Sequence, residues 1–402
     1  MALMLDEEMD ENVTTIKVIG VGGGGGNAVN RMVSDGLQGV DFIAMNTDQQ
    51  ALAKNHAATK VQLGSKLTKG RGAGADPEIG QRAAEESKDE IANALKGSQM
   101  VFITAGMGGG TGTGAAPVVA EIAREAGILT VGVVTKPFKF EGKRRMDQAN
   151  MGIKELLGKV DSLLIIPNDR LKYATDQKVT LANAFEIADD VLHQAVTSIS
   201  DLIKNTGFIN LDFADVTCIM KDAGFAHMGV GHAAGKGKAE DAAKLAVASP
   251  LMETSINGAR GVLINITGSE DMDLEDVETA ANLVQEAAHP EANIIFGATF
   301  DSAMQDEIRV TVIATGFEEA PSGSASAPAS AAAPVSGAVR PVSVKERPQG
   351  LFTGAAEKAA AAAPAAAPIV PPPMSEDRPA SASGDAPAED PFDSIFKIFN
   401  TK

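Results

Sequence analysis

The sequence is poor in aromatic residues and in cysteine. Its 402 residues include no Trp, a single Tyr (Tyr173) and a single Cys (Cys218). Single-stranded nucleic acid is commonly bound by stacking on aromatic side chains, and an internal disulfide needs two cysteines, so we expect neither feature. The net charge of -18 also argues against binding to the phosphate backbone of nucleic acid. These absences exclude nucleic acid as an expected partner.

The marks of a membrane or secreted protein are missing as well. No apolar run is long enough to span a bilayer, and residues 1–11 are acidic where a signal peptide would be cationic. We therefore expect a cytoplasmic protein that does not insert directly into a membrane. A hydrophobic content of 44% over 402 residues allows two domains with sizeable cores.

The most informative feature is a glycine-rich stretch at residues 105–114. It follows an apolar run (100–104) that predicts a buried strand and precedes residues 115–124, which predict a helix with Pro117 in its first turn. Backbone amides at such a turn and the positive end of the helix dipole favour an anion, and Thr111 and Thr113 add hydroxyl donors. We interpret the stretch as a cradle for a phosphate chain. The alternative is a tight turn that needs glycine only for its geometry.

A second strand–glycine–helix unit begins the chain. An apolar run at 16–21 leads into glycines 22–26, and Asn27 is a candidate helix cap. Residues 20–25 fit the dinucleotide pattern G-x-G-x-x-G, which keeps an NAD-dependent enzyme open as an alternative. Two points weigh against it: the expected ribose-binding acid is unclear, with Asn46 and Asp48 as candidates, and a second glycine loop is not part of that pattern. No G-x-x-x-x-G-K-[ST] motif occurs.

The order of the segments predicts the fold class. Short Val/Ile/Leu-rich runs alternate with amphipathic segments, which indicates an α/β protein with a doubly wound parallel sheet whose ligand lies at the carboxyl ends of the strands. A long amphipathic helix and a second, smaller α+β domain follow, and an Ala/Pro/Ser-rich segment comes after them. The expected divisions are a disordered arm (1–13), a nucleotide-binding domain (14–178), a central helix (179–206), an α+β domain (207–318), a disordered linker (319–388) and a C-terminal docking peptide (389–402).

Several motifs together resemble the tubulin/FtsZ superfamily. They are the glycine–threonine run of residues 108–114, the glycines of 22–26 before Asn27, the acidic segment 210–215 and the terminal peptide on its tether. The similarity extends over residues of about 14 to 317 and is closest to the bacterial cell-division branch. It implies a tubulin-like fold, GTP and GDP as ligands with Mg²⁺, head-to-tail assembly into protofilaments, and a role in the division ring at midcell.

The resemblance also implies which residues bind the nucleotide. The phosphates are approached by Gly23, Gly24, Gly25, Gly26 and Asn27 from the first loop and by Gly110, Thr111 and Gly112 from the second. Ala73 and Gly74 belong to the loop that senses the γ-phosphate. Glu141 binds the ribose and Arg145 the phosphate side; Asn168 and Asp189 read guanine, and Phe185 packs on the base. From the residues alone, Asp189 and Arg145 also fit solvated surface charges beside Asp190 and Arg144.

Catalysis is implied to depend on a neighbouring molecule. In the resemblance Asn210, Asp212 and Asp215 of one subunit reach the nucleotide of the next, where the carboxylates position the attacking water and cation. The residues alone leave open that Asp212 is a turn former or helix cap, and that the chain is a nucleotide-binding scaffold without turnover. No metal-binding side chains are assigned, because phosphate oxygens and few protein ligands suit Mg²⁺.

The end of the chain predicts a docking site for other proteins. Residues 391–402 combine acidic and apolar side chains, which indicates a docking peptide. The resemblance implies that its partners are membrane-tethering and regulatory division proteins. The segment lacks the internal proline and terminal arginine that relatives often carry, and a frayed terminus is the alternative.

Overall fold

The computed structural model describes residues 14–173, 178–181, 183–204, 209, 212–251, 256–269, 272–301 and 304–317. The predicted arm (1–13), the linker (319–388) and the docking peptide (389–402) lie outside the described residues, as does Asn210. None of the described helices is both long and apolar enough to cross a bilayer.

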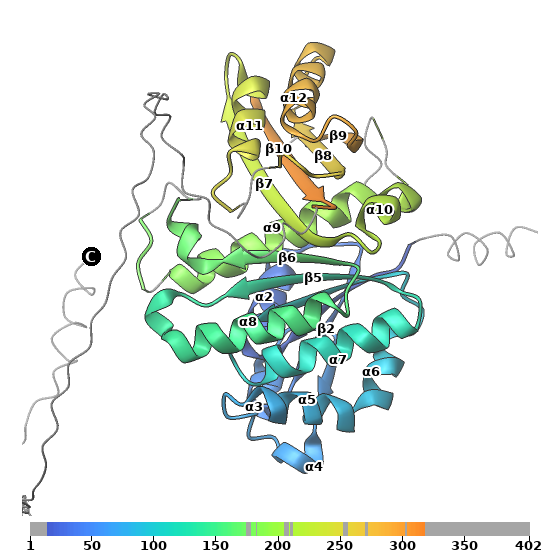
Figure 1. Ribbon diagram of the computed structural model, residues 1–402, viewed down its shortest axis with the longest axis vertical. Coiled ribbons are helices and arrows are strands. Elements are labelled where there is room, and N and C mark those ends of the chain that lie inside the picture. Colours follow the sequence, from blue (N-terminus) through green and yellow to red (C-terminus); the bar gives the residue numbers. More distant parts are fainter. Residues whose placement is uncertain are drawn as a thin grey trace, which may run out of the picture. The chain divides into compact units, whose positions relative to one another are not determined.

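A single ten-stranded sheet runs through the described residues in the order β3-β2-β1-β4-β5-β6-β7-β10-β8-β9 (Figure 1). Its first part is parallel and consists of β1 (Ile16–Val21), β2 (Val40–Asn46), β3 (Thr59–Gln62), β4 (Met100–Gly106), β5 (Leu129–Lys136) and β6 (Ser162–Pro167). Because the chain leaves β1 and returns in β4 on its other side, the strand order reverses beside β1. Open α/β sheets bind ligands at such a reversal.

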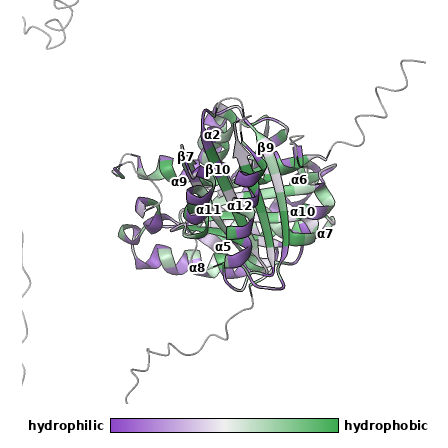
Figure 2. Cartoon of the chain, turned by 90° about the horizontal axis from the view of Figure 1, so that it is seen from above, coloured by the Kyte–Doolittle hydropathy of each residue, from purple (hydrophilic) through white to green (hydrophobic). Residues whose placement is uncertain are grey.

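Helices cover both faces of this parallel part, as the doubly wound prediction requires. Successive residues of one strand point to opposite faces of the sheet. Val18 and Phe102 belong to the core with α2 (Gly22–Ser34) and α9 (Ala184–Lys204). Ile19 and Ile103 belong to the core on the other face. That other face carries α5 (Pro77–Glu86), α6 (Lys88–Leu95), α7 (Thr111–Glu125) and α8 (Lys143–Leu157). In Figure 2 the strands are mostly hydrophobic, whereas α11 and α12 show much hydrophilic surface.

The second part of the sheet continues from the first through β7. β7 (Gly224–Ala234) pairs with β6 in parallel and with β10 (Glu307–Thr315) antiparallel; β8 (Gly261–Gly268) and β9 (Asn293–Phe300) complete it. Helices α11 (Lys238–Val247) and α12 (Leu274–Ala287) pack on it around a third core that includes Ile264 and Val310. The remaining elements are α3 (Gln49–Lys54), α4 (Ser65–Thr68), α10 (Phe213–Met220) and the 3-10 helices η2 (Lys139–Glu141) and η3 (Asn168–Tyr173).

Several predicted boundaries differ from the structure. Helix α2 begins at Gly22 rather than at Asn27, and α7 begins at Thr111, which moves Pro117 out of its first turn. Glycines 22–26, and Gly112 and Gly114 of the second run, thus lie in first turns of helices, where packing against the sheet outweighs the low helix propensity of glycine. The central helix was predicted from residue 179 but begins at Ala184, because the Asn183 side chain accepts the Thr180 amide at 2.7 Å and forms a turn there.

Candidate nucleotide site

The first loop presents open backbone amides at the start of α2. A Cβ on Gly25 would lie 2.2 Å from the carbonyl oxygen of Thr104, so glycine is needed for α2 to sit against β4. A Cβ on Gly24 would lie 3.2 Å from the backbone of Gly106, and the carbonyl oxygen of Gly26 accepts a hydrogen bond from the Asn55 side chain. Gly23 is exposed, and nothing lies within 4 Å of a Cβ built on it, so the first turn of α2 is open on this side. The positive end of α2 is therefore accessible to an anion.

The second loop meets the first. A Cβ on Gly22 would lie 2.8 Å from the amide nitrogen of Gly112, which places the N-termini of α2 and α7 side by side. The hydroxyl of Thr111 is engaged within the protein, 2.7 Å from the hydroxyl of Thr47, and that of Thr113 accepts the Gly108 amide at 2.8 Å. Both threonines are buried. Backbone amides, more than these hydroxyls, are thus left for a phosphate chain.

A third loop, which precedes α5, contacts the second. A Cβ on Gly110 would lie 2.9 Å from the Cβ of Ala73, so the two loops touch. Gly74 has a φ of 61° and open space around it, and Ala75 shares this left-handed conformation with a φ of 60°. Three glycine-containing loops, predicted from separate stretches of sequence, therefore converge at the carboxyl ends of β1, β2 and β4.

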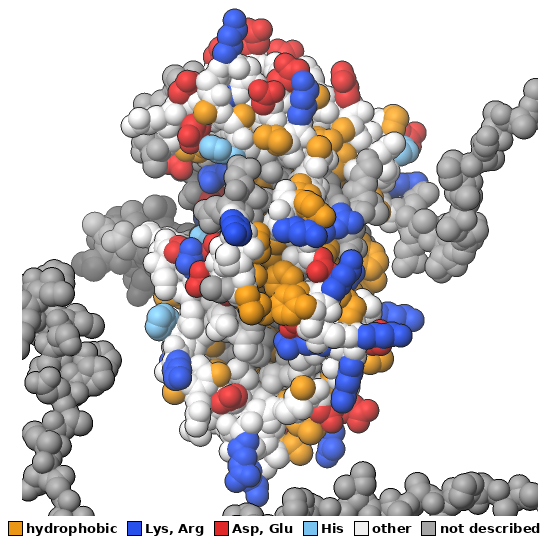
Figure 3. Space-filling view, turned by 90° about the vertical axis from the view of Figure 1, so that its left-hand side faces the viewer, with side chains coloured by type: hydrophobic (Ala, Val, Ile, Leu, Met, Phe, Trp, Pro, Cys, Tyr) orange, Lys and Arg blue, Asp and Glu red, His pale blue; other side chains and the backbone are white. Residues whose placement is uncertain are grey.

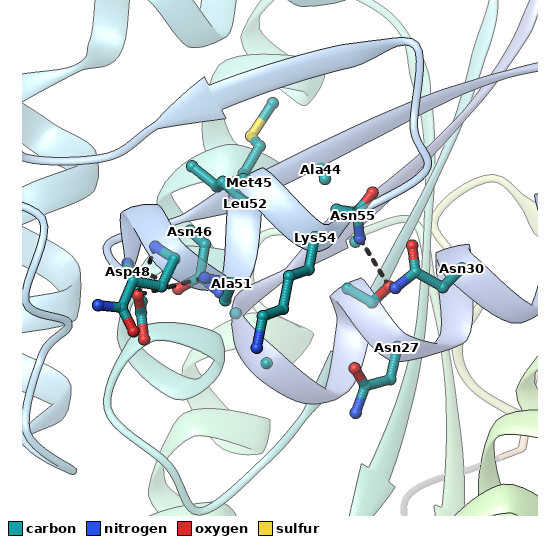
Figure 4. Close-up of a pocket in the computed structure, with 15 residues that line it drawn as sticks. Asn27, Asn30, Ala44, Met45, Asn46, Asp48, Ala51, Leu52, Lys54 and Asn55 are labelled. Carbon is teal, nitrogen blue, oxygen red and sulfur yellow. Dashed lines mark hydrogen bonds between the residues drawn. The ribbon is translucent and has the colours of Figure 1, made fainter.

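A cavity of about 310 Å³ opens beside the start of α2 (Figure 4). Of the predicted residues, Gly23, Gly26 and Asn27 line it; the others do not. The lining residues that were not assigned to the site from the sequence include the polar Asn30, Lys54 and Asn55. In Figure 4 the Lys54 side chain extends from α3 toward α2. A cation and several amide groups around one cavity suit a phosphate.

The predicted ribose-side residues are tied to each other. Glu141 accepts the Phe138 amide through Oε1 at 2.8 Å, and its Oε2 lies 3.2 Å from Nε of Arg145. The ring of Phe138 stands edge-on to that of Phe185, with centroids 5.5 Å apart, and Phe185 is 46% exposed. Figure 3 shows one face of the molecule on which hydrophobic side chains gather among Lys and Arg. Glu141, Arg145 and the first turn of α9 thus form one continuous region.

Asn168 carries a buried oxygen that a ligand could satisfy. It follows β6, is 5% exposed, and its Oδ1 is among the buried side-chain oxygens without a hydrogen-bond partner in the part of the chain that the structure describes. A buried polar atom without a partner is costly. A purine base that donates an N–H would satisfy it, so the residues present fit the predicted nucleotide.

Asp189 lies on α9, which contacts η3 and β6. Burial raises the pKa of Asp189 to about 7; the negative charges of Asp190 and Glu186 add to this rise and Arg31 opposes it. A carboxylate near its pKa at neutral pH is stabilised in the charged form by two N–H donors. Guanine supplies such a pair at N1 and N2, so Asp189 suits that base.

The predicted catalytic residues lie near the amino ends of the parallel strands, opposite the glycine loops. Asp212 is the N-cap of α10: it accepts the Asp215 amide at 2.7 Å, and Asp215 accepts the Asp212 amide at 3.2 Å. The next residue, Phe213, lines a cavity of about 290 Å³ together with Gln99, Leu129 and Asp161. Those three mark the amino ends of β4, β5 and β6, whereas the glycine loops mark carboxyl ends. The structure therefore does not bring Asp212 and Asp215 to the glycine loops.

Comparison with known proteins agrees with this geometry. Residues 15–176 match the GTPase domain of the tubulin/FtsZ family, and residues 224–318 match the C-terminal domain of the FtsZ family. The FtsZ dimer from M. jannaschii is 43% identical, with a TM-score of 0.74 over 78% of this chain and 92% of that one. The chain belongs to the tubulin/FtsZ family.

Other members share the fold at greater distance. CetZ2 from Haloferax volcanii, solved as a GTPγS-bound protofilament, is 22% identical, with a TM-score of 0.65 over 77% of this chain and 95% of that one. For the chain in hand, membership means a tubulin/FtsZ family GTPase domain that binds GTP and GDP. The three converging loops, the orphaned Asn168 oxygen and Asp189 form its candidate nucleotide site.

Sequence reasoning also did not assign Thr47, Lys54 and Arg31, which lie in or beside this candidate site. Thr47 holds the second loop, Lys54 borders the cavity and Arg31 pairs with Asp190. The sequence held a signal for Thr47, because it lies in the polar segment Asn46 to Asp48 that follows a predicted strand. The other two lie on helices whose orientation only packing determines.

Proposed function

We propose that the protein is a GTPase that polymerises head to tail into protofilaments of the bacterial division ring, with Asp212 of one subunit completing the nucleotide site of the next. One observation carries the proposal: the glycine loops and the Asp212 cap lie at opposite ends of the same parallel strands. A strand such as β4, with seven residues, is about 20 Å long. A hydrogen bond cannot cover that distance, which supports a second copy as the source of the carboxylates.

Such a contact joins two different surfaces of the same molecule. A heterologous contact generates an open filament unless its rotation closes a ring. The M. jannaschii FtsZ structure is a dimer and the CetZ2 structure is a protofilament, which supports self-association of the present chain. Hydrolysis removes the contacts of the γ-phosphate at the interface and so weakens it, which couples turnover to disassembly.

The chain's own residues have separate tasks in this reaction. Amides at the starts of α2 and α7 bind the phosphate oxygens, the loop with Ala73 and Gly74 lies where the γ-phosphate would be sensed, and Asn168 and Asp189 hold guanine. Asp212 and Asp215 of the neighbouring subunit orient a water for attack on the γ-phosphorus, and GTP and water yield GDP and phosphate. Bound Mg²⁺ would neutralise phosphate charge. Among the described residues no group of three His, Cys, Asp or Glu side chains is arranged to hold a metal, so its ligands would be mainly phosphate oxygens and water.

The domain roles follow from this scheme. Residues 14–178 bind the nucleotide, the central helix (179–206) connects them to the α+β domain (207–318), and Asn210 completes the acidic loop. The linker (319–388) tethers residues 389–402, and we propose that positions 391–402 bind membrane-tethering and regulatory division proteins. We place the assembled protein in the cytoplasm at midcell.

Turnover measured against protein concentration tests the shared site. We expect no GTP hydrolysis below a threshold concentration, then hydrolysis that rises together with light scattering, with ATP and NAD as inactive controls. Turnover proportional to protein from zero concentration contradicts the shared site. GTP binding without turnover at any concentration supports the alternative of a scaffold, and reaction with NAD supports a dehydrogenase.

A truncation tests the terminal peptide separately. Deleting residues 391–402 is expected to leave polymerisation in solution unchanged and to abolish recruitment to vesicles that carry a membrane-tethering division protein. Unchanged recruitment would refute the docking role. The comparison of both assays on the same preparation separates this role from the GTPase.

A further inference from the structure

Arg31 connects the phosphate-binding helix to the base-reading helix. It lies on α2, whose first turn contains the glycines of the first loop. Its Nε is 3.0 Å from Oδ2 of Asp35, just beyond the end of α2, and 2.9 Å from Oδ1 of Asp190 on α9. One guanidinium thus contacts carboxylates of both helices.

The ion pair acts on two helices that already share a core. Ala28, Val29 and Met32 of α2 belong to the same buried cluster as Ala188, Val191 and Leu192 of α9. Successive residues on a helix are about 100° apart, so holding Asp190 toward α2 fixes the direction in which its neighbour Asp189 points.

Arg31 is also the cation beside an acidic group of residues. Glu186 and Asp190 flank Asp189 on α9, and Asp35 faces α9 from the end of α2. His193 lies 3.4 Å from Oδ2 of Asp35, but burial lowers its pKa from 6.5, so it is mainly neutral at pH 7. Without Arg31, the carboxylate that reads guanine would have only acidic neighbours among the charges that influence it.

We propose that Arg31 is a positioning residue for guanine recognition: by binding Asp190 it orients α9 so that Asp189 faces the base, and it keeps a positive charge beside that carboxylate. The inference rests on the proposed function, since it concerns the same nucleotide site. It adds a residue that touches neither the base nor the phosphates.

The test is GDP binding to the full chain, measured by calorimetry from pH 6 to pH 9. Arg31 lowers the pKa of Asp189, so removing its charge should raise that pKa further. Arg31→Gln is therefore expected to weaken GDP binding about tenfold at pH 7 and by a smaller factor near pH 9, where Asp189 is ionised in either protein and only the orientation of α9 is lost. Arg31→Lys should retain most of the affinity. The control is Arg124→Gln on α7, which removes a similarly exposed arginine from an ion pair with Asp222.

The pH profile separates positioning from general stabilisation. A merely structural role would lower affinity by the same factor at every pH, and that result, or a parental profile for Arg31→Gln, overturns the inference. In an Asp189→Asn background the pH-dependent part of the Arg31→Gln effect should vanish, because the amide does not titrate; its persistence also overturns it. If the unmodified chain binds no GDP, the proposed function itself fails.

Discussion

Asp212 and Asp215 each accept the backbone amide of the other, at 2.7 Å and 3.2 Å, and together begin α10. This reciprocal cap explains why two carboxylates occur three residues apart. The interpretation of Asp212 as a helix cap is therefore compatible with a catalytic role for its carboxylate. The cap fixes the carboxylates at the surface where a second subunit would meet them.

Two substitutions at Asp212 separate the cap from catalysis. Asn caps a helix about as well as Asp, whereas Ala costs about 1 kcal/mol of stability. Asp212→Asn is therefore expected to keep the unfolding midpoint and GTP binding while losing most hydrolysis, and Asp212→Ala to lose stability as well. Steady-state hydrolysis and denaturant unfolding are the measurements. Asp273→Ala removes the same kind of cap from α12 and should lose only stability. Parental turnover by Asp212→Asn contradicts the catalytic role.

Two neighbouring glycines should respond oppositely to a methyl group. Gly25→Ala places a Cβ 2.2 Å from a backbone oxygen of β4, so we expect a loss of roughly 1–3 kcal/mol or more in unfolding free energy. Gly23→Ala enters open space and should leave stability unchanged, but its methyl group would lie where we propose that the phosphates bind. Its GTP affinity should fall at least about tenfold. Equal affinity for Gly23→Ala and the parent would show that the phosphates lie elsewhere.

Asp189 should make the stability of the nucleotide-free protein depend on pH. Its folded pKa is raised to about 7 from 3.8, so its contribution is fully present below pH 3.8 and is lost as pH rises through 7. The parent should therefore lose stability relative to Asp189→Asn by up to about 1.4 kcal/mol per pH unit between pH 5 and pH 6.5. Urea unfolding at these pH values measures the difference. A difference that stays constant with pH would mean that Asp189 is ionised throughout.

Bound GDP should reverse that dependence. Guanine stabilises the charged carboxylate, so the affinity of the parent should rise about tenfold between pH 6 and pH 8 as the carboxyl with a pKa of about 7 ionises. Asp189→Asn should bind more weakly and with little change over this range. Calorimetry with GDP, and with ADP as control, checks both points. The same pH dependence in Asp189→Asn would assign the titration to another group.

Lys54 borders the cavity beside α2 and should contribute to phosphate binding. A charge-assisted hydrogen bond contributes about 1.5–3 kcal/mol, so Lys54→Gln is expected to weaken GTP binding about tenfold at low salt and less at high salt. Lys60→Gln on β3, which does not line the cavity, is the matched control. Equal affinities of the two variants would remove Lys54 from the site.

Much of the candidate site could be predicted from the sequence, because the residues that form it are close together in the chain. A strand, a glycine run and a helix start are consecutive in the chain, and a phosphate cradle is made of their backbone, so the two glycine loops were located from sequence. The helix boundaries inside them were wrong by four or five residues, since glycine propensity points away from the helix that packing and an anion favour. β7 was missed as a strand for a related reason: its glycines and histidines resemble a loop, and only pairing with β6 and β10 makes it extended.

The sequence by itself determined the alternation of strands and helices, the two phosphate loops and the acidic cap, because these depend on neighbours in the chain. Only the tertiary structure decided that Asp212 lies at the end of the strands opposite the glycine loops, that Thr47 holds Thr111 and that Arg31 pairs with Asp190. Those relations join residues far apart in sequence, and they exist because burial of apolar surface fixes how α2, α7 and α9 lie on one sheet.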